Sequence, residues 1–207
     1  MLERFRRFWT WLLSPIAHGL LRIGVSPDAV TLVGTLGVSA GALVFFPQGE
    51  LLVGVLVITV FVFSDLIDGY MARESGRTSK WGAFWDSTLD RLADAAIFGG
   101  LVFYYADHED NMLMASVALC CLVMGSVTSY ARARAESLGM QAKVGIAERA
   151  DRLVAILVMT GFSDIFDLPI LLTVTLWALA AASTITVVQR MVIVHSQAMR
   201  SDAESAS

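Results

Sequence analysis

Six apolar segments, separated by short polar connections, constrain the fold of this chain more than any other feature of its sequence. They cover residues 28–46, 51–72, 82–106, 112–131, 147–163 and 168–194. A helix needs about 20 residues to cross the hydrocarbon core of a bilayer, and all but the fifth segment are long enough. The fifth reaches that length only if it includes the charged residues within 148–152. The sequence therefore predicts an all-α integral membrane protein with six transmembrane helices.

Composition agrees with a membrane protein and excludes several other classes. Hydrophobic residues make up 56% of the 207 residues and charged residues 16%, whereas soluble domains average about 45–50% and about 25%. The apolar content excludes a disordered chain, and the presence of only two cysteines excludes a disulfide scaffold. A formal net charge of −4 argues against a nucleic-acid partner.

The distribution of Lys and Arg predicts how the chain is oriented. Connections 47–50, 107–111 and 164–167 contain none of the 15 Lys and Arg residues, which all fall on the other side of the six segments. Cytoplasmic loops are enriched in Lys and Arg, so we expect a multi-pass plasma-membrane protein with both termini and the charged motifs in the cytoplasm.

The two ends of the chain differ from the apolar segments. Residues 1–24 combine arginines with aromatic and aliphatic residues at helical spacing, which is typical of an amphipathic helix lying in the membrane interface. The last residues, SDAESAS, are small and polar. The predicted organisation is an interfacial helix over 1–24, a six-helix transmembrane domain over 25–197 and a disordered tail over 198–207.

Four aspartates lie inside the predicted spans, where ionisable residues are expensive and mark functional sites. Asp65 and Asp68 are three residues apart near the end of the second segment, and Asp86 and Asp90 are four apart near the start of the third. These spacings place each pair on one face of its helix. The short connection makes the two helices antiparallel neighbours, so the four carboxylates converge and require protonation or a bound cation.

Oxygen ligands favour a hard cation such as magnesium or calcium over zinc. One alternative is a set of separate ion pairs with the neighbouring basic residues Arg73, Arg77, Lys80 and Arg91. For Asp94, which follows Asp90 by four, an ion pair with Arg91 is expected. A second alternative is a cation transporter or channel. A transport pathway distributes polar groups through the membrane depth, whereas these groups gather at the cytoplasmic end.

The carboxylates belong to a longer pattern that resembles the signature of the CDP-alcohol phosphotransferase family. It reads Asp65-Leu-Ile-Asp68-Gly69-Tyr-Met-Ala72-Arg73, then eight residues, then Gly82-x3-Asp86-x3-Asp90. Every fixed position of the signature is filled. Upstream, the run Ser26-Pro27-Asp28-Ala-Val-Thr31 is similar to the family's Pro-Asn-x-x-Thr element, with Asp in place of Asn.

This resemblance implies a reaction in which a CDP-linked lipid binds through two divalent metals, an acceptor hydroxyl attacks the phosphorus that bears the lipid, and CMP leaves. It implies two Mg²⁺ ions, or Mn²⁺ in their place, ligated by Asp65, Asp68, Asp86 and Asp90. Asp90 is also the implied catalytic base. Contacts with the CDP-lipid are implied for Asp28, Thr31, Gly69, Ala72, Arg73, Thr78 and Gly82.

Basic residues in the second half of the chain favour an acceptor that carries a phosphate. Arg152 and Arg190 are each followed by an apolar run, and an arginine embedded in this way requires an anion, for which its planar fork suits a phosphate. The alternative is a row of interfacial arginines that follows the positive-inside rule.

The segments SYARARAESLG and ERADR resemble actinobacterial phosphatidylinositol phosphate synthases, which are homodimers that join inositol phosphate to CDP-diacylglycerol. The resemblance implies an acceptor-phosphate site at Ser129, Arg132, Arg134, Arg152 and Arg190. The predicted function is thus a membrane transferase that forms phosphatidylinositol phosphate and releases CMP. Its expected partners are the two substrates, the bilayer and a second copy of the chain. The alternative acceptor is glycerol 3-phosphate, as in phosphatidylglycerophosphate synthases.

Overall fold

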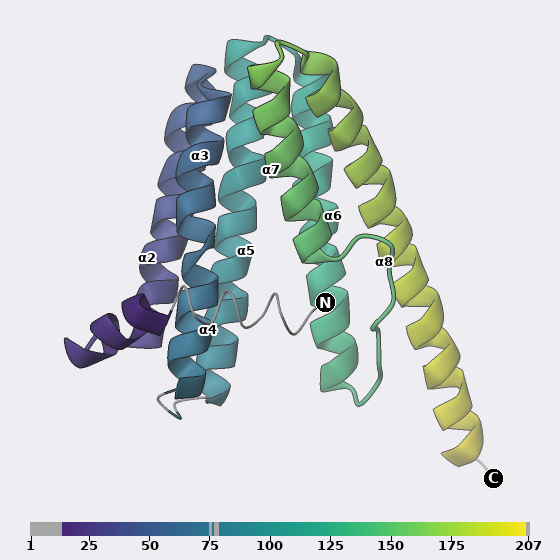
Figure 1. Ribbon diagram of the computed structural model, residues 1–207. Coiled ribbons are helices and arrows are strands. Elements are labelled where there is room, and N and C mark those ends of the chain that lie inside the picture. The colour runs from purple at the N-terminus through teal and green to yellow at the C-terminus, as the bar shows by residue number, and fades with distance from the viewer. Residues whose placement is uncertain (1–13, 75, 77–78, 206–207) are drawn as a thin grey trace, which may run out of the picture. The chain divides into compact units, whose positions relative to one another are not determined.

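The computed structural model describes residues 14–74, 76 and 79–205, and every regular element within them is a helix (Figure 1). The α-helices are α2 (Pro27–Ala40), α3 (Leu51–Val62), α4 (Ser64–Glu74), α5 (Lys80–Phe103), α6 (Met112–Ser137), α7 (Arg149–Ile165) and α8 (Pro169–Ser205). Shorter helical turns extend two of them: η1 (Gly41–Phe45) and η2 (Phe46–Gln48) follow α2, and η3 (Tyr104–His108) follows α5. The predicted all-α class is confirmed.

The helices form two compact units, Met1–Gly100 and Leu101–Ser207. In the first unit, α2 packs against α3 and α4. In the second unit, α6 and α7 both pack against α8 (Figure 1). Each unit carries one of the two groups of predicted site residues, and each is described by itself below.

α2 packs closely against α3 and α4 in the first unit, and this contact positions α4, the helix that carries Asp65 and Asp68. A Cβ added at Gly34 would collide with the side chain of Ser64, and one added at Gly37 would collide with the ring of Phe61. Small residues allow helices in membranes to approach this closely. Phe63 separates α3 from α4, two residues before Asp65, the first aspartate of the motif.

Each of the six predicted apolar segments is helical, and four helical stretches among the described residues are long and apolar enough to cross a membrane. These are Pro27–Gln48, Leu51–Glu74, Met112–Ser137 and Pro169–Ser201. α7 has only 17 residues, fewer than the roughly 20 that a span needs. α5 is long enough, but its first half carries the charged residues of the motif.

The described part of the N-terminal end is helical where an interfacial helix is predicted, whereas the C-terminal end is helical where a disordered tail is predicted. Residues 14–22 form a helix, and the rest of the predicted interfacial helix, 1–13, lies outside the described residues. This helix contacts α4, because the hydroxyl of Tyr70 donates to Ser14 Oγ at 3.3 Å. At the other end, α8 continues to Ser205, where the sequence predicts a disordered tail. Residues 198–205 contain neither Gly nor Pro, so a helix that is already formed propagates through them.

Candidate active site

A cavity of about 280 Å³ in the first unit collects most of the predicted motif residues. Its lining residues are Pro27, Asp28, Thr31, Asp68, Gly69, Ala72, Ser79, Gly82, Ala83 and Asp86. They come from the start of α2, from α4, and from the residues around the start of α5. Asp68 on α4 and Asp86 on α5 thus line one site, as the spacing of the aspartates predicts, together with the start of α2.

Asp68 is the buried carboxylate of this cavity, with only 6% of the residue exposed. Its Oδ2 accepts a hydrogen bond of 2.5 Å from the hydroxyl of Thr31, which is equally buried. The Thr31 hydroxyl also lies 3.1 Å from the carbonyl oxygen of Pro27, one turn earlier on α2. α2 therefore orients a carboxylate of α4 toward the cavity.

Asp28 is held by two indole rings that the sequence analysis did not single out. Trp81 Nε1 donates to Asp28 Oδ2 at 3.1 Å, and Trp85 Nε1 donates to the Asp28 carbonyl oxygen at 3.1 Å. The two indoles stack with ring centroids 5.5 Å apart. Asp28 Oδ1 faces Gly82, because a Cβ added there would lie 3.9 Å from it. One carboxylate oxygen is thus fixed by Trp81, and the other lies beside the motif glycine.

Ser79 is a second lining residue that sequence reasoning missed. Its Oγ accepts a hydrogen bond of 2.9 Å from the backbone N–H of Gly82, at the first turn of α5. The signals that point to Ser79 and Trp81 are local: a hydroxyl residue three positions before the motif glycine, which is typical of a helix start, and an aromatic residue directly beside that glycine.

Asp86 and Asp90 lie one turn apart on α5 but differ in their surroundings. Asp86 is exposed and lines the cavity, whereas Asp90 is half-buried and is not a lining residue. Arg91 Nη2 lies 3.8 Å from Asp90 Oδ2 and 3.6 Å from Asp94 Oδ2. The predicted Arg91–Asp94 ion pair is confirmed, and Asp90 shares the same guanidinium.

Three predicted residues fall at the edge of what the structure describes. Asp65 is one turn before Asp68 on α4, but its side chain lies outside the described atoms, and so does all of Thr78. Arg73 is exposed on α4, and its Nη1 lies 3.5 Å from the position of a Cβ added at Gly69. These three positions remain predictions.

The donors of the cavity suit a hard divalent cation. Asp28, Asp68 and Asp86 supply carboxylate oxygens and Thr31 a hydroxyl, and none of the described lining residues is basic. Such oxygen donors are the ones that magnesium and manganese prefer. Among the side chains that the structure describes, no three His, Cys, Asp or Glu form a ready metal cluster. The side chain of Asp65, another predicted ligand, is not among those described.

In the second unit, two arginines of the predicted acceptor site are buried and bound to backbone carbonyls. Arg152 on α7 is 2% exposed, and its Nη1 donates to Ala147 O at 3.1 Å. Arg190 on α8 is 4% exposed, and its Nε donates to Val144 O at 2.9 Å. Its Nη1 donates to Thr128 O on α6 at 2.6 Å. These bonds fix the planes of both guanidinium groups.

The three other predicted acceptor residues lie on α6 itself. Ser129 is half-buried, and its hydroxyl donates to Gly125 O at 3.3 Å. Arg132 Nε forms a 3.0 Å ion pair with Glu136 Oε1 one turn later. Arg134 is exposed, and its Nη1 donates to Ser137 Oγ at 3.3 Å. Arg134 is nine positions after Gly125, which places it on the opposite side of α6.

Comparison with known proteins assigns the chain to a class. The sequence model of the CDP-alcohol phosphatidyltransferase family matches residues 24–160, more than half of the chain. The chain belongs to the CDP-alcohol phosphatidyltransferase family, as its motif residues predict. The matched range contains both groups of site residues apart from Arg190.

The relatives narrow the class further. The chain is 52% identical to the phosphatidylinositol phosphate synthase of Streptomyces avermitilis, covering 100% of this chain and 88% of the relative. It is 50% identical to the synthase of the same name from Cutibacterium acnes, covering 94% and 98%. The predicted resemblance to actinobacterial synthases of this kind is confirmed.

Solved structures of a relative agree with the fold and with the expected ligands. The phosphatidylinositol phosphate synthase of Mycobacterium tuberculosis with CDP-DAG bound matches with a TM-score of 0.84 and 45% identity, covering 88% of this chain and 92% of that one. The same protein in complex with manganese and citrate matches with the same TM-score and covers 88% of each chain. That relative is thus solved with CDP-DAG bound and, separately, in complex with manganese and citrate.

Proposed function

We propose that this protein is a membrane transferase that joins inositol phosphate to CDP-diacylglycerol, forming phosphatidylinositol phosphate and releasing CMP. The observation that carries the proposal is the cavity of the first unit. Seven residues that the family motif singles out, from three segments of the chain, line this one space. The relatives at 50% and 52% identity, both phosphatidylinositol phosphate synthases, support the choice of reaction.

In the proposed reaction the cavity binds the CDP end of the lipid substrate. Gly69, Ala72 and Gly82 present little side-chain bulk there, so a nucleotide can approach the backbone of α4 and α5. A divalent cation bound by the carboxylates would supply positive charge to the diphosphate and to the departing CMP. Asp68 is the pre-oriented ligand of this set, because Thr31 fixes its carboxylate. Two ions with Asp65, Asp68, Asp86 and Asp90 as ligands, and Mg²⁺ as the metal, form part of the proposal.

Asp90 is proposed as the general base. It takes the proton from the acceptor hydroxyl as the oxygen of that hydroxyl bonds to the phosphorus bearing diacylglycerol. The bond from that phosphorus to the bridging oxygen breaks, and CMP leaves with the electron pair. Arg91 lies against both Asp90 and Asp94 and so fixes the Asp90 carboxylate on its face of α5. A base that is positioned in this way typically contributes a factor of about 10²–10⁴ to the rate.

The acceptor phosphate is proposed to bind to Ser129, Arg132, Arg152 and Arg190 of the second unit. Arg134 lies on the opposite side of α6 from Gly125 and is included in the proposal on the resemblance to the synthases alone. Backbone carbonyls orient the guanidinium groups of both Arg152 and Arg190. Guanidinium groups that are oriented in this way bind phosphate through charge-assisted hydrogen bonds.

The wider arrangement of the protein is part of the same proposal. Six membrane spans, an interfacial helix over residues 1–24 and cytoplasmic termini follow from the apolar segments and from the distribution of Lys and Arg. We also propose a homodimer in the plasma membrane. Four helical stretches of the described chain have the length and hydropathy of spans, which supports the membrane location.

The direct test measures CMP release by the purified protein in lipid vesicles that contain CDP-diacylglycerol, with inositol phosphate as the acceptor. The proposal expects stoichiometric CMP and phosphatidylinositol phosphate, loss of both with a chelator, and recovery with Mg²⁺ or Mn²⁺ but not with Zn²⁺. Full activity in excess chelator contradicts the metal site. Ion flux through the vesicles without CMP release contradicts the enzyme and supports the transporter alternative.

A further inference from the structure

Residues 138–148, called the strap below, join α6 to α7 without forming a helix and run beside α8 (Figure 1). The strap is bonded to α8 at both of its ends. Near its start, Gln197 Nε2 donates to Gln141 O at 2.6 Å, and the Gln141 N–H donates to Gln197 Oε1 at 3.0 Å. One glutamine side chain thus satisfies the donor and the acceptor of one backbone residue.

The end of the strap, residues 144–147, is a node that joins the three helices of the second unit. Thr186 Oγ1 on α8 accepts from the N–H of Ile146 at 3.2 Å and from the N–H of Ala147 at 3.3 Å. The carbonyls on either side of these two amides accept from the buried arginines. Val144 O binds Arg190, and Ala147 O binds Arg152. A single hydroxyl therefore fixes the short backbone stretch on which both guanidinium groups are oriented.

Gly145 permits this arrangement. Its φ of 145° lies in the region that favours glycine, and a Cβ added there would collide with Cγ2 of Thr186. A larger residue would therefore move the strap away from the Thr186 hydroxyl. The contact therefore requires a glycine at position 145 of the strap, opposite Thr186 of α8.

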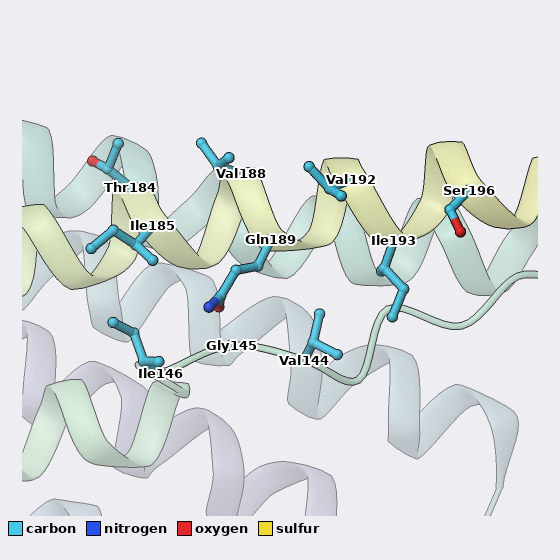
Figure 2. Close-up of a pocket in the computed structure, with 10 residues that line it drawn as sticks. All are labelled: Val144, Gly145, Ile146, Thr184, Ile185, Val188, Gln189, Val192, Ile193 and Ser196. Atoms are coloured by element: carbon cyan, nitrogen blue, oxygen red, sulfur yellow. The ribbon is translucent and has the colours of Figure 1, made fainter.

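Figure 2 shows the side chains that line a pocket between the strap and α8. Val144 and Ile146 of the strap and Ile185, Val188, Val192 and Ile193 of α8 line an apolar groove of about 680 Å³. An extended backbone beside such a surface needs partners for its polar groups, since an unsatisfied group in an apolar environment is expensive. Thr186, Arg190 and Gln197 provide such partners, so side chains of α8 fix the strap beside that helix.

We propose that Thr186 is a positioning residue for the acceptor site: it fixes residues 144–147 of the strap, and through their carbonyls it orients the guanidinium groups of Arg152 and Arg190. This inference rests on the proposed function, because those two arginines are the proposed ligands of the acceptor phosphate. Thr186 itself does not contact the substrate. Loss of its hydroxyl therefore weakens the binding of the acceptor and leaves the CDP-lipid site of the first unit unchanged.

The test is Thr186→Val, which keeps the shape of the side chain and removes the acceptor oxygen. Thr184→Val is the matched control. Thr184 lies on the same helix and its hydroxyl donates to the carbonyl one turn earlier, at 2.7 Å, as that of Thr186 does at 2.8 Å. Only Thr186 also accepts the two strap amides. We expect Thr186→Val to raise the KM for inositol phosphate about tenfold, with kcat and the KM for CDP-diacylglycerol within about twofold of wild type.

Two further variants make the outcome decisive. Thr186→Ser restores the hydroxyl and should restore the acceptor KM, whereas Gly145→Ala keeps the hydroxyl but forces the strap away and should raise the KM as Thr186→Val does. If Thr186→Val does not fold, Gly145→Ala decides the question. An unchanged acceptor KM in the folded variants overturns the proposal. So does an equal change in Thr184→Val, or a rise that Thr186→Ser does not reverse.

A second measurement separates this proposal from the proposed function. Amide hydrogen exchange in the strap needs no substrate, and Thr186→Val should increase exchange at Ile146 and Ala147, whereas Thr184→Val should not. If wild type uses another phosphate-bearing acceptor, the proposed function is wrong, and the same KM comparison is made with that acceptor. Unchanged exchange at the two amides overturns the role of Thr186 whatever the acceptor is.

Discussion

The hydroxyl of Thr31 donates a hydrogen bond of 2.5 Å to Oδ2 of Asp68, across 37 positions of the sequence. Both residues are more than nine-tenths buried, and both line the cavity that holds the family motif. The bond ties the Pro-Asp-x-x-Thr run at the start of α2 to the first acidic pair on α4. Thr31 of this run therefore orients the Asp68 carboxylate.

Thr31→Val removes this bond and keeps the side-chain volume nearly constant. A hydrogen bond to a charged group contributes about 1.5–3 kcal/mol, so we expect the Mg²⁺ concentration for half-maximal activity to rise at least about tenfold. Thr35→Val is the control, because Thr35 is also buried on α2 but donates only to Thr31 O, at 3.0 Å. An equal shift in the two variants would show that Thr31 affects packing rather than Asp68.

The indole of Trp81 is expected to act on the site through Asp28. Trp81→Phe keeps an aromatic ring but loses the N–H that binds Asp28 Oδ2. We expect the KM for CDP-diacylglycerol to rise about threefold to tenfold, because Trp81 is exposed and its one hydrogen bond there contributes only about 0.5–1.5 kcal/mol. A double-mutant cycle with Asp28→Ala measures the coupling. Strictly additive effects of the two substitutions contradict a role for Trp81 through Asp28.

Asp90→Asn keeps the size of the proposed base and removes its ability to accept a proton. We expect kcat to fall by about 10²–10⁴, with CDP-diacylglycerol still bound in an equilibrium binding assay. Asp107→Asn, the same substitution at an exposed position in the connection after α5, should leave kcat unchanged. Activity of Asp90→Asn above a tenth of wild type contradicts the assigned role.

The arginines of the second unit should separate into two kinds. Arg134 is exposed, and Arg134→Ala should raise the KM for the acceptor about tenfold or more without lowering the melting temperature. Arg190→Ala should do both, because Arg190 also binds carbonyls of the strap and of α6. Arg200→Ala, at an exposed position further along α8, is the control and should change neither. Unchanged acceptor kinetics in both Arg134→Ala and Arg190→Ala would make these residues interfacial arginines only.

Part of the first site can be predicted from the sequence because the information for that part is local. Helical spacing within Asp65–Asp68 and Asp86–Asp90, together with a short connection between two helices, is enough to predict that they meet. The cavity contains Asp68 and Asp86 as expected. Trp81 cannot be assigned to the site in this way, because Trp residues are common at membrane interfaces whether or not they have a functional role. Its contact with Asp28 depends on how α2 packs against the start of α5.

The second site was less predictable because it depends on contacts between distant segments. The sequence indicates that Arg152 and Arg190 are embedded, and both are buried. It does not indicate that their partners include backbone carbonyls of an irregular strap, since no periodic pattern marks residues 138–148. The end of α8 was missed for a different reason. A short polar sequence is compatible with disorder, but it continues a helix that precedes it.

The most direct test of the central claim is a comparison of acceptors at equal concentration. Initial rates of CMP release from CDP-diacylglycerol are measured for inositol phosphate, glycerol 3-phosphate, inositol and serine, with the lipid product identified in each case. The account predicts rapid turnover with inositol phosphate, much slower turnover with glycerol 3-phosphate, and little with inositol or serine, which carry no phosphate for the arginines of the second unit. Robust turnover with glycerol 3-phosphate alone contradicts the proposed acceptor, and preference for inositol or serine contradicts a phosphate site at those arginines.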